Sequence, residues 1–366
     1  MKIPYINIKK QYFSEKKKLL KVIDKTLGSG NWVGGSEVDK FENNISRLCK
    51  VKYCVSLNSG TDALTLALHL LGVRKGDEVI TPPNSFIAST AVIVHLGAKP
   101  IFVDVKKDQS IDETKIEEKI TNKTKVIMPV HLTGRMCNME MIMSISKKYK
   151  IPVVEDCAQS ILSSFKGKMS GAWGDIGCFS AHPLKNLNAI GDAGYLTTNS
   201  KEVYKKIQNL KTHGMSDNRD NVKNFGYVSR MDNLQAAVLN FRLKSLKKVI
   251  DIRRKNTEIY LKNLDIKKIF FPQEKKEEFN TYHTFVIQVD KRDKLKNYLK
   301  KNGVDTAIHY PVPIHLQTAS KSLGYKIGAF PETEKQSKRI LTLPVNQYIK
   351  KKEILYISRL INNFYS

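Results

Sequence analysis

The sequence predicts an α/β fold whose large domain is built on a mostly parallel sheet. Short apolar runs rich in valine and isoleucine alternate with segments of helical periodicity, and Gly, Pro, Asn or Asp residues separate them. Strands that are apolar throughout are typical of a parallel sheet that helices cover on both faces. A chain of 366 residues is also too long for one small core, which indicates two domains.

Each element of the large domain follows from its local pattern. Leu19, Ile23 and Leu27 recur at helical intervals before a Gly-Ser-Gly turn, so residues 13–27 are expected to form a helix. Further helices are expected at 37–49, 62–73, 87–97 and 139–149. Strands are expected at 51–57, 77–83, 100–105, 126–132, 151–156, 176–181 and 194–198.

The pattern changes at Asn233. Residues 233–264 contain good helix formers without Gly or Pro, which predicts one long helix. We expect it to connect a large domain, residues 1–245 with an N-terminal arm, to a smaller α+β domain, residues 246–366. The expected elements of the small domain are strands at 281–289 and 305–310 and helices at 292–302, 334–341 and 351–363.

Composition limits the possible partners. The net charge of +27 comes from 51 Lys and only 11 Arg, whereas nucleic-acid binding favours Arg and aromatic stacking. We therefore expect a solvated Lys-rich surface and no nucleic acid; a nucleic-acid binder stays a rival that only the charge favours. Apolar runs are too short for a bilayer and no signal peptide is evident. Five cysteines without a CxxC pair indicate free thiols in a cytoplasmic protein without a metal site.

Three loops at strand ends are candidates for chemistry, because ligands gather there in α/β sheets. Residues 58–63 (Asn-Ser-Gly-Thr-Asp-Ala) lie between a strand and a helix and could bind an anion, or simply cap the helix. Asp156 ends a buried strand, where a carboxylate needs a cationic partner unless it only caps the strand; Gln159 lies three residues further.

The third loop, residues 180–194, contains Ser180 and His182 before a proline and Lys185 after it. Most lysines are surface charges, but the surroundings of Lys185 are apolar and rich in turns. An amine in a dry pocket has a low pKa and can form a Schiff base with a carbonyl compound.

These loops belong to a series of motifs along nearly the whole chain. The series is GSGNWVGGSEVDKFE (28–42), NSGTDAL (58–64), TPPNSFIASTAVI (81–93), PIFVDV (100–105), HLTGR (131–135), VVEDCAQS (153–160), GDIGCFSAHPLKNLNAIGDAGYLTTN (174–199), SRMDNLQAA (229–237), IHYPVPIHLQ (308–317) and LTLPVN (341–346). It resembles the DegT/DnrJ/EryC1/StrS sugar aminotransferase family, within the fold-type-I enzymes that depend on pyridoxal 5'-phosphate.

The resemblance implies roles around the cofactor ring. Lys185 matches the lysine that binds pyridoxal phosphate covalently and later moves a proton. Asp156 would face the pyridine nitrogen and keep it protonated, so that the ring withdraws electrons. Gln159 would bind near the phenolic oxygen, and Phe86 would stack on the ring unless it is a core residue. The phosphate would be held by Gly60, Thr61 and Ser180.

Other matches concern the substrate and the partner chain. His309, Tyr310 and His315 match residues near the substrate entrance, although a His here could equally be structural. Arg230 could bind a donor carboxylate or stabilise a loop. The chain departs from the family at Val228, where an Asn usually reaches across the dimer to the cofactor phosphate.

The resemblance implies a homodimer with shared active sites and glutamate as the donor. The segment KNLNAIGDAG is similar to the branch of the family that aminates the 3-keto position of nucleotide sugars. It is less similar to the KxxTTGEGG branch, which acts at 4-keto positions. The expected pathway is the synthesis of a surface polysaccharide or capsule. A third branch replaces the lysine by histidine and dehydrates sugars, which the intact Lys185 argues against. Two alternatives stay open: a small ketone phosphate such as dihydroxyacetone phosphate as acceptor, and a regulator that binds the cofactor without turnover.

Overall fold

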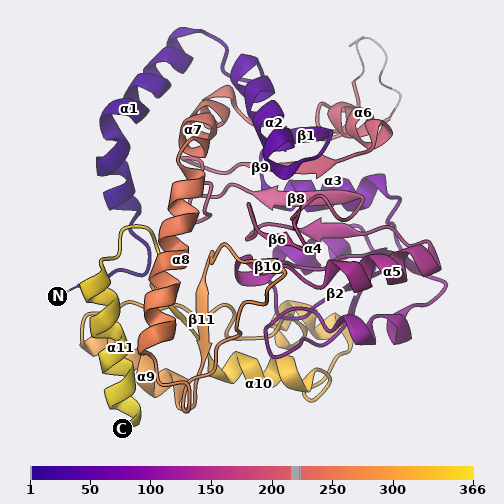
Figure 1. The fold of residues 1–366 in the computed structure, drawn as a ribbon. Coiled ribbons are helices and arrows are strands. Elements are labelled where there is room, and N and C mark those ends of the chain that lie inside the picture. Colours follow the sequence, from indigo (N-terminus) through magenta and orange to yellow (C-terminus); the bar gives the residue numbers. More distant parts are fainter. Residues whose placement is uncertain (1, 216–221, 223) are drawn as a thin grey trace.

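The computed structural model describes residues 2–215, 222 and 224–366, and its large sheet is mostly parallel, as predicted (Figure 1). Hydrogen bonds join its strands in the orders β3-β2-β4 and β5-β8-β9-β1. Parallel bridges from Ile127 to Val153 and from Val130 to Asp156 connect β4 to β5. Every strand except β9 runs in the same direction. The strands are β1 (Tyr53–Leu57), β2 (Glu78–Thr81), β3 (Lys99–Phe102), β4 (Thr124–Ile127), β5 (Val154–Asp156), β8 (Ile176–Ser180) and β9 (Gly194–Thr198).

Helices cover both faces of this sheet because successive strand residues point to opposite sides. On one face, Cys178 and Leu196 pack against α3 (Gly60–Leu70), α6 (Lys201–Leu210) and α4 (Ala88–His95). On the other face, their neighbours Phe179 and Tyr195 stack with ring centroids 4.8 Å apart. This second layer contains α2 (Ser36–Cys49), α7 (Asn233–Leu243) and, further along the sheet, α5 (Met139–Tyr149).

The C-terminal part has a core of its own. Tyr260, Ile287 and Leu341 are fully buried in it. Its elements are α8 (Leu246–Asn263), β11 (Phe285–Gln288), α9 (Arg292–Lys301), α10 (Pro331–Arg339), β12 (Ile340–Leu343) and α11 (Lys351–Tyr365). A small sheet of β10 (Glu278–Phe279), β6 (Ser164–Phe165) and β7 (Lys168–Met169) connects this part to the large one.

The N-terminal arm crosses both parts of the molecule. Ile3 is buried in the C-terminal core, and its backbone nitrogen donates to the carbonyl oxygen of Gly303 at 2.8 Å. The arm then continues into α1 (Ile8–Gly28), which runs along the outside of the molecule beside α7 (Figure 1). The domain boundary at residues 245 and 246 stays a prediction.

Three sequence expectations need correction. The helix predicted at 233–264 is interrupted between α7 and α8, where the Ser245 backbone nitrogen and hydroxyl both donate to the Arg242 carbonyl oxygen at 3.0 Å. A serine that bonds to the local backbone in this way competes with helix continuation. The strand expected at 305–310 is a single bridge from Ala307 to Thr342. The helix expected at 334–341 covers 331–339, and residues 340–343 form β12.

No helix in the described part of the chain combines the length and the apolar character needed to cross a membrane.

Candidate active site

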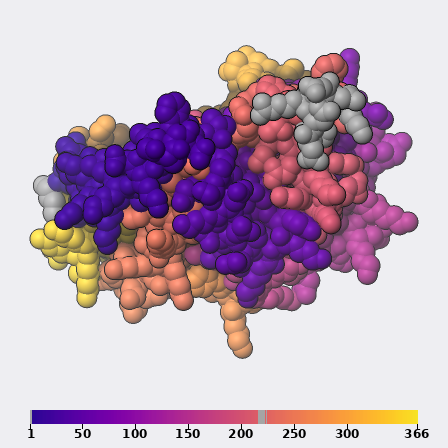
Figure 2. All heavy atoms as spheres, turned by 90° about the horizontal axis from the view of Figure 1, so that it is seen from above, coloured from indigo at the N-terminus to yellow at the C-terminus, as the bar shows by residue number. Residues whose placement is uncertain are grey.

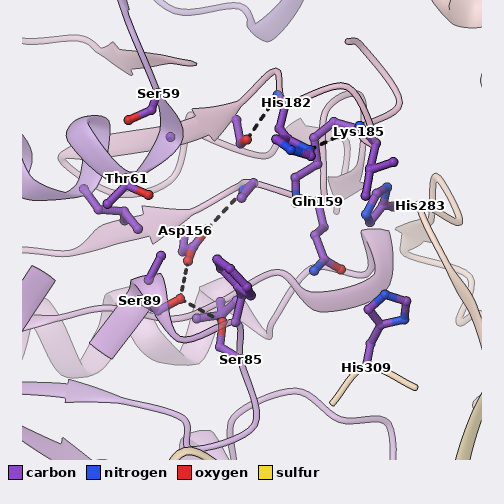
Figure 3. Close-up of a pocket in the computed structure, with 18 of the residues that line it drawn as sticks. Ser59, Thr61, Ser85, Ser89, Asp156, Gln159, His182, Lys185, His283 and His309 are labelled. Carbon is purple, nitrogen blue, oxygen red and sulfur yellow. Dashed lines mark hydrogen bonds between the residues drawn. The ribbon is translucent and has the colours of Figure 1, made fainter. Parts of the chain in front are cut away.

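A cavity of about 380 Å³ lies at the carboxyl ends of the parallel strands (Figure 3). The ends of β1, β5 and β8 place Ser59, Asp156 and Ser180 on its wall. Tyr5 of the N-terminal arm and His309 of the C-terminal part close the opposite side. The cavity therefore combines residues from both parts of the chain, at the position where α/β sheets bind ligands.

One end of the cavity is built to receive an anion. Ser59 caps α3, and its hydroxyl oxygen accepts a 3.0 Å hydrogen bond from the Asp62 amide. The helix N-terminus presents further N–H groups and positive partial charge. A side chain at Gly60 would place its Cβ 2.7 Å from the Cβ of Ser180, so only glycine allows this close approach. Gly60, Thr61 and Ser180 thus lie together at this end.

Asp156 is held in one orientation by two donors. Its Oδ2 accepts a 2.7 Å hydrogen bond from the Ser89 hydroxyl, and its Oδ1 accepts a 3.1 Å bond from the Ala158 amide. Ser89 is in turn 2.8 Å from the hydroxyl of Ser85. The Asp156 side chain is only 4% exposed, so this carboxylate faces the cavity and not bulk water.

Lys185 lies across the cavity from Asp156 and is partly buried (Figure 3). Burial lowers the pKa of its amine to about 8, and the negative charge of Asp156 partly opposes this shift. A substantial fraction of this amine is therefore unprotonated near neutral pH. That fraction can act as a nucleophile or as a base.

Gln159, Phe86 and Tyr310 form the next part of the wall. Gln159 Oε1 accepts from the Thr133 amide at 2.8 Å, and its Nε2 donates to the Tyr310 hydroxyl oxygen at 3.3 Å. Phe86 is 55% exposed and lies beside Tyr310, with ring centroids 5.9 Å apart. Burial and the charge of Asp156 raise the pKa of Tyr310 to about 12, so it stays a hydrogen-bond donor.

His283 and His309 lie on the Lys185 side of the cavity (Figure 3). His309 Nδ1 is 2.9 Å from the Thr342 hydroxyl; burial and the charge of Lys185 lower its pKa to about 4. Burial, Lys185 and Arg253 lower the pKa of His283 well below its usual value. Both imidazoles are therefore neutral at neutral pH. The buried Nδ1 of His283 has no hydrogen-bond partner among the described residues.

Two expected substrate residues lie elsewhere. His315 is only 2% exposed; its ring packs edge-on against Phe330, and its Nε2 is 3.0 Å from Glu334, so it supports the structure around the cavity without lining it. Arg230 is exposed and absent from the cavity wall. Val228 is half exposed, and its backbone pairs with Thr212.

Several residues of the site were not predicted. Ser85, Ser89, His283 and Tyr5 all line the cavity. The two serines belong to the quoted segment 81–93, so an NSFIAS loop next to a strand was the available signal. His283 and Tyr5 have no local signal of function, because only the tertiary fold brings them to Lys185.

The donor set of the cavity fits pyridoxal phosphate. An amine with a lowered pKa can bind an aldehyde, a buried carboxylate can pair with a ring nitrogen, and a capped helix start beside glycine can bind a phosphate. Lys185, Asp156 and the Gly60 loop supply these three features within one cavity.

Comparison with known proteins agrees with this chemistry. The model of the DegT/DnrJ/EryC1/StrS aminotransferase family matches residues 14–362. The chain belongs to this family. The members of this family are aminotransferases that depend on pyridoxal phosphate. The protein is therefore an aminotransferase with this cofactor.

Individual relatives match over the full length. The chain is 36% identical over 369 residues to a pleiotropic regulatory protein of Geobacillus stearothermophilus, covering 100% of this chain and 99% of the relative. It is also 36% identical to the dTDP-3-amino-3,6-dideoxy-alpha-D-galactopyranose transaminase of Aneurinibacillus thermoaerophilus, covering 99% of each. The crystal structure of DesV from S. venezuelae superposes with a TM-score of 0.96 at 31% identity, covering 99% of this chain and 98% of that one. These matches confirm the predicted fold class.

Proposed function

We propose that this sugar aminotransferase transfers an amino group from glutamate to the 3-keto position of a nucleotide-linked sugar, in the synthesis of a surface polysaccharide. The observation that supports it most strongly is one cavity that contains Lys185, Asp156 and the start of α3. Its overall reaction converts glutamate and the keto sugar into 2-oxoglutarate and the amino sugar.

Lys185 has two tasks in this proposal. Its amine would hold the cofactor and, once freed by an incoming amine, would take a proton from the substrate carbon and later return one. A pKa of about 8 suits both tasks, because the amine can lose and regain a proton near neutral pH. Pyridoxal phosphate, when bound, supplies an aldehyde for the amine and a ring that withdraws electrons.

Asp156 and the α3 loop orient the cofactor. The Asp156 carboxylate, fixed by Ser89 and the Ala158 amide, keeps a proton on the ring nitrogen. Gly60, Thr61 and Ser180 would hold the phosphate, and Phe86 and Gln159 would face the ring. The presence of all these residues on the wall of one cavity supports these roles.

The acceptor would bind against a group of polar side chains that carry no charge. Tyr5, His283, His309 and Tyr310 line the cavity, and the pKa shifts of both histidines and of Tyr310 keep these groups neutral. Neutral donors and acceptors suit the hydroxyl groups of a sugar. The 3-keto position is supported by the segment 185–194 and by the name of the Aneurinibacillus relative.

A small ketone phosphate fits less well. Among the described residues that line the cavity, Lys185 is the one lysine or arginine, and it is used by the cofactor. A second phosphate inside the cavity would therefore meet no cation of this part of the chain. In a nucleotide-linked sugar the phosphates are joined to the anomeric carbon and not to a carbon next to the ketone, so they can lie outside this cavity.

A regulator without turnover is favoured by the regulatory names of some relatives, such as that of Geobacillus. A binding protein needs no amine poised to move protons. Lys185 and Asp156 are both present and face one cavity, which supports catalysis instead.

A second copy of the chain would complete the enzyme. Apolar side chains are exposed on α1 and on the loop after it: Tyr12 (37%), Phe13 (60%), Leu20 (45%), Leu27 (46%) and Trp32 (62%). The N-terminal helices lie open on one face of the molecule (Figure 2). Such a group of exposed apolar residues indicates a protein interface. Light scattering should give a dimer mass for the wild type and a lower mass for Phe13→Glu/Trp32→Glu.

A panel of acceptors tests the proposal. The enzyme is first converted to its pyridoxamine form with glutamate; 3-keto nucleotide sugars, 4-keto nucleotide sugars and dihydroxyacetone phosphate are then added separately. We expect rapid loss of the pyridoxamine form only with a 3-keto nucleotide sugar. Faster reaction with dihydroxyacetone phosphate or with a 4-keto sugar would contradict the proposed acceptor.

A further inference from the structure

The loop that carries Lys185 is closed at its base by backbone hydrogen bonds. The Ala181 amide donates to the Ala193 carbonyl oxygen and the Ala189 amide donates to that of Ala181, both at 2.8 Å. Within the loop, the Lys185 amide donates to the His182 carbonyl oxygen, also at 2.8 Å. Side chains from other elements hold the rest of this loop.

Gln11 of α1 and Asn188 of this loop form a reciprocal amide pair. Gln11 Nε2 donates to Asn188 Oδ1 at 3.0 Å, and Asn188 Nδ2 donates to Gln11 Oε1 at 3.1 Å. The same Nδ2 donates to the Pro183 carbonyl oxygen at 2.8 Å, which ties together the two sides of Lys185. Gln11 is 9% and Asn188 6% exposed, so water competes little for these bonds.

A second contact fixes the same turn from α7. Arg242 Nη1 donates to the carbonyl oxygens of Asn188 at 2.7 Å and of Ala189 at 3.1 Å. Glu15, one helical turn after Gln11, forms an ion pair with Arg242. Side chains of α1 thus reach the Lys185 loop directly through Gln11 and indirectly through Glu15.

We infer that Gln11 is a positioning residue for Lys185 and acts through Asn188. This inference rests on the proposed role of Lys185 in cofactor binding. The Lys185 amine has to reach the cofactor and later a substrate carbon, and a misplacement of ~1 Å can slow such a step by about 100-fold. The N-terminal helix, which lies far from Lys185 in sequence, is therefore part of the catalytic apparatus.

The test measures how fast the cofactor-free enzyme binds pyridoxal phosphate covalently at Lys185. Samples taken at successive times are reduced with borohydride, which makes the bond to Lys185 permanent, and the labelled fraction is measured. Gln11→Met keeps the side-chain volume but removes both bonds to Asn188. Gln11→Met/Asn188→Leu replaces both amides by apolar groups of similar shape, which limits the loss of stability that one unpaired buried amide causes. Thr26→Val is the matched control, because Thr26 is also a buried residue of α1 but its hydroxyl donates to the Val22 carbonyl oxygen of the same helix.

We expect capture to slow at least tenfold in Gln11→Met and in the double variant, with Thr26→Val at the wild-type rate. The pH midpoint of the absorbance of the bound cofactor should also move in the two pair variants only. Melting temperatures show whether each variant is folded. If Gln11→Met is unfolded and the double variant is folded, the capture rate of the double variant tests the inference. Capture at the control rate by a folded pair variant would overturn the inference. Failure of the wild type to capture the cofactor at Lys185 would reject the proposed function as well.

Discussion

Ser89 donates a 2.7 Å hydrogen bond to Oδ2 of Asp156, from the start of α4 to the end of β5. The two residues are separated by 67 positions in the sequence, and both are almost completely buried. A hydroxyl that donates to a carboxylate stabilises its charged form. Ser89 therefore helps to keep the Asp156 carboxylate pointed into the cavity.

The first prediction concerns this pair. Asp156→Asn removes the charge opposite the ring nitrogen with little change in shape, and we expect single-turnover transamination to slow by several powers of ten. Ser89→Ala removes one bond to a charged group, worth about 1.5–3 kcal/mol, and should slow the reaction by roughly ten- to a hundredfold. Ser46→Ala, a helix serine that bonds only to the Glu42 carbonyl oxygen, is the control. Turnover of Asp156→Asn near the wild-type rate would exclude the proposed role of Asp156.

The second prediction uses the lowered pKa of Lys185. Only the neutral amine captures the cofactor, so the capture rate of the cofactor-free enzyme should rise with pH and reach half its maximum near pH 8. The negative charge of Asp156 raises this pKa, so Asp156→Asn should move the midpoint to lower pH. Rapid-mixing absorbance at a series of pH values measures both curves. A wild-type midpoint near the usual lysine value of about 10.5 would contradict the buried environment.

The fold and the strand-end loops could be predicted because they depend on local patterns. Apolar runs located the strands; Asp156 ends one strand, and Lys185 lies in the loop that follows another. Pairs such as Ser89–Asp156 and Gln11–Asn188 could not be predicted, because each joins segments that only tertiary packing brings together. His315 illustrates the opposite problem: its neighbours suggested a substrate site, while the packing of Phe330 and Glu334 places it outside the cavity.

The third prediction concerns Val228, where the resemblance to the family implies an asparagine. Val228 is 52% exposed on this chain, so its side chain is available to a second copy. Val228→Asn should restore one hydrogen bond to the phosphate and tighten pyridoxal phosphate binding by about tenfold or more, without a change of acceptor. Titration of the cofactor into cofactor-free wild type and variant measures the two dissociation constants. Equal constants would rule out a contact across the dimer at this position.

The fourth prediction concerns stability at acidic pH. The pKa of His309 is about 4 in the folded protein, below the usual value of about 6.5 expected for the unfolded chain. Between these two values the unfolded chain binds the proton more tightly, so stability falls as the pH drops from about 6.5 to 4. His309→Gln lacks this titration, and its melting temperature should fall less than that of the wild type across this range. An equal fall of the melting temperature in both proteins would show that the titration of His309 does not contribute to the loss of stability at acidic pH.

The central claim is that Lys185 carries the cofactor covalently. It is tested by borohydride reduction of the holoenzyme, followed by digestion and mass spectrometry of the labelled peptide. We expect a single labelled lysine, Lys185, in the wild type, and only reversible cofactor binding with no transamination in Lys185→Ala. A label on another lysine, together with transamination by Lys185→Ala, would contradict the account.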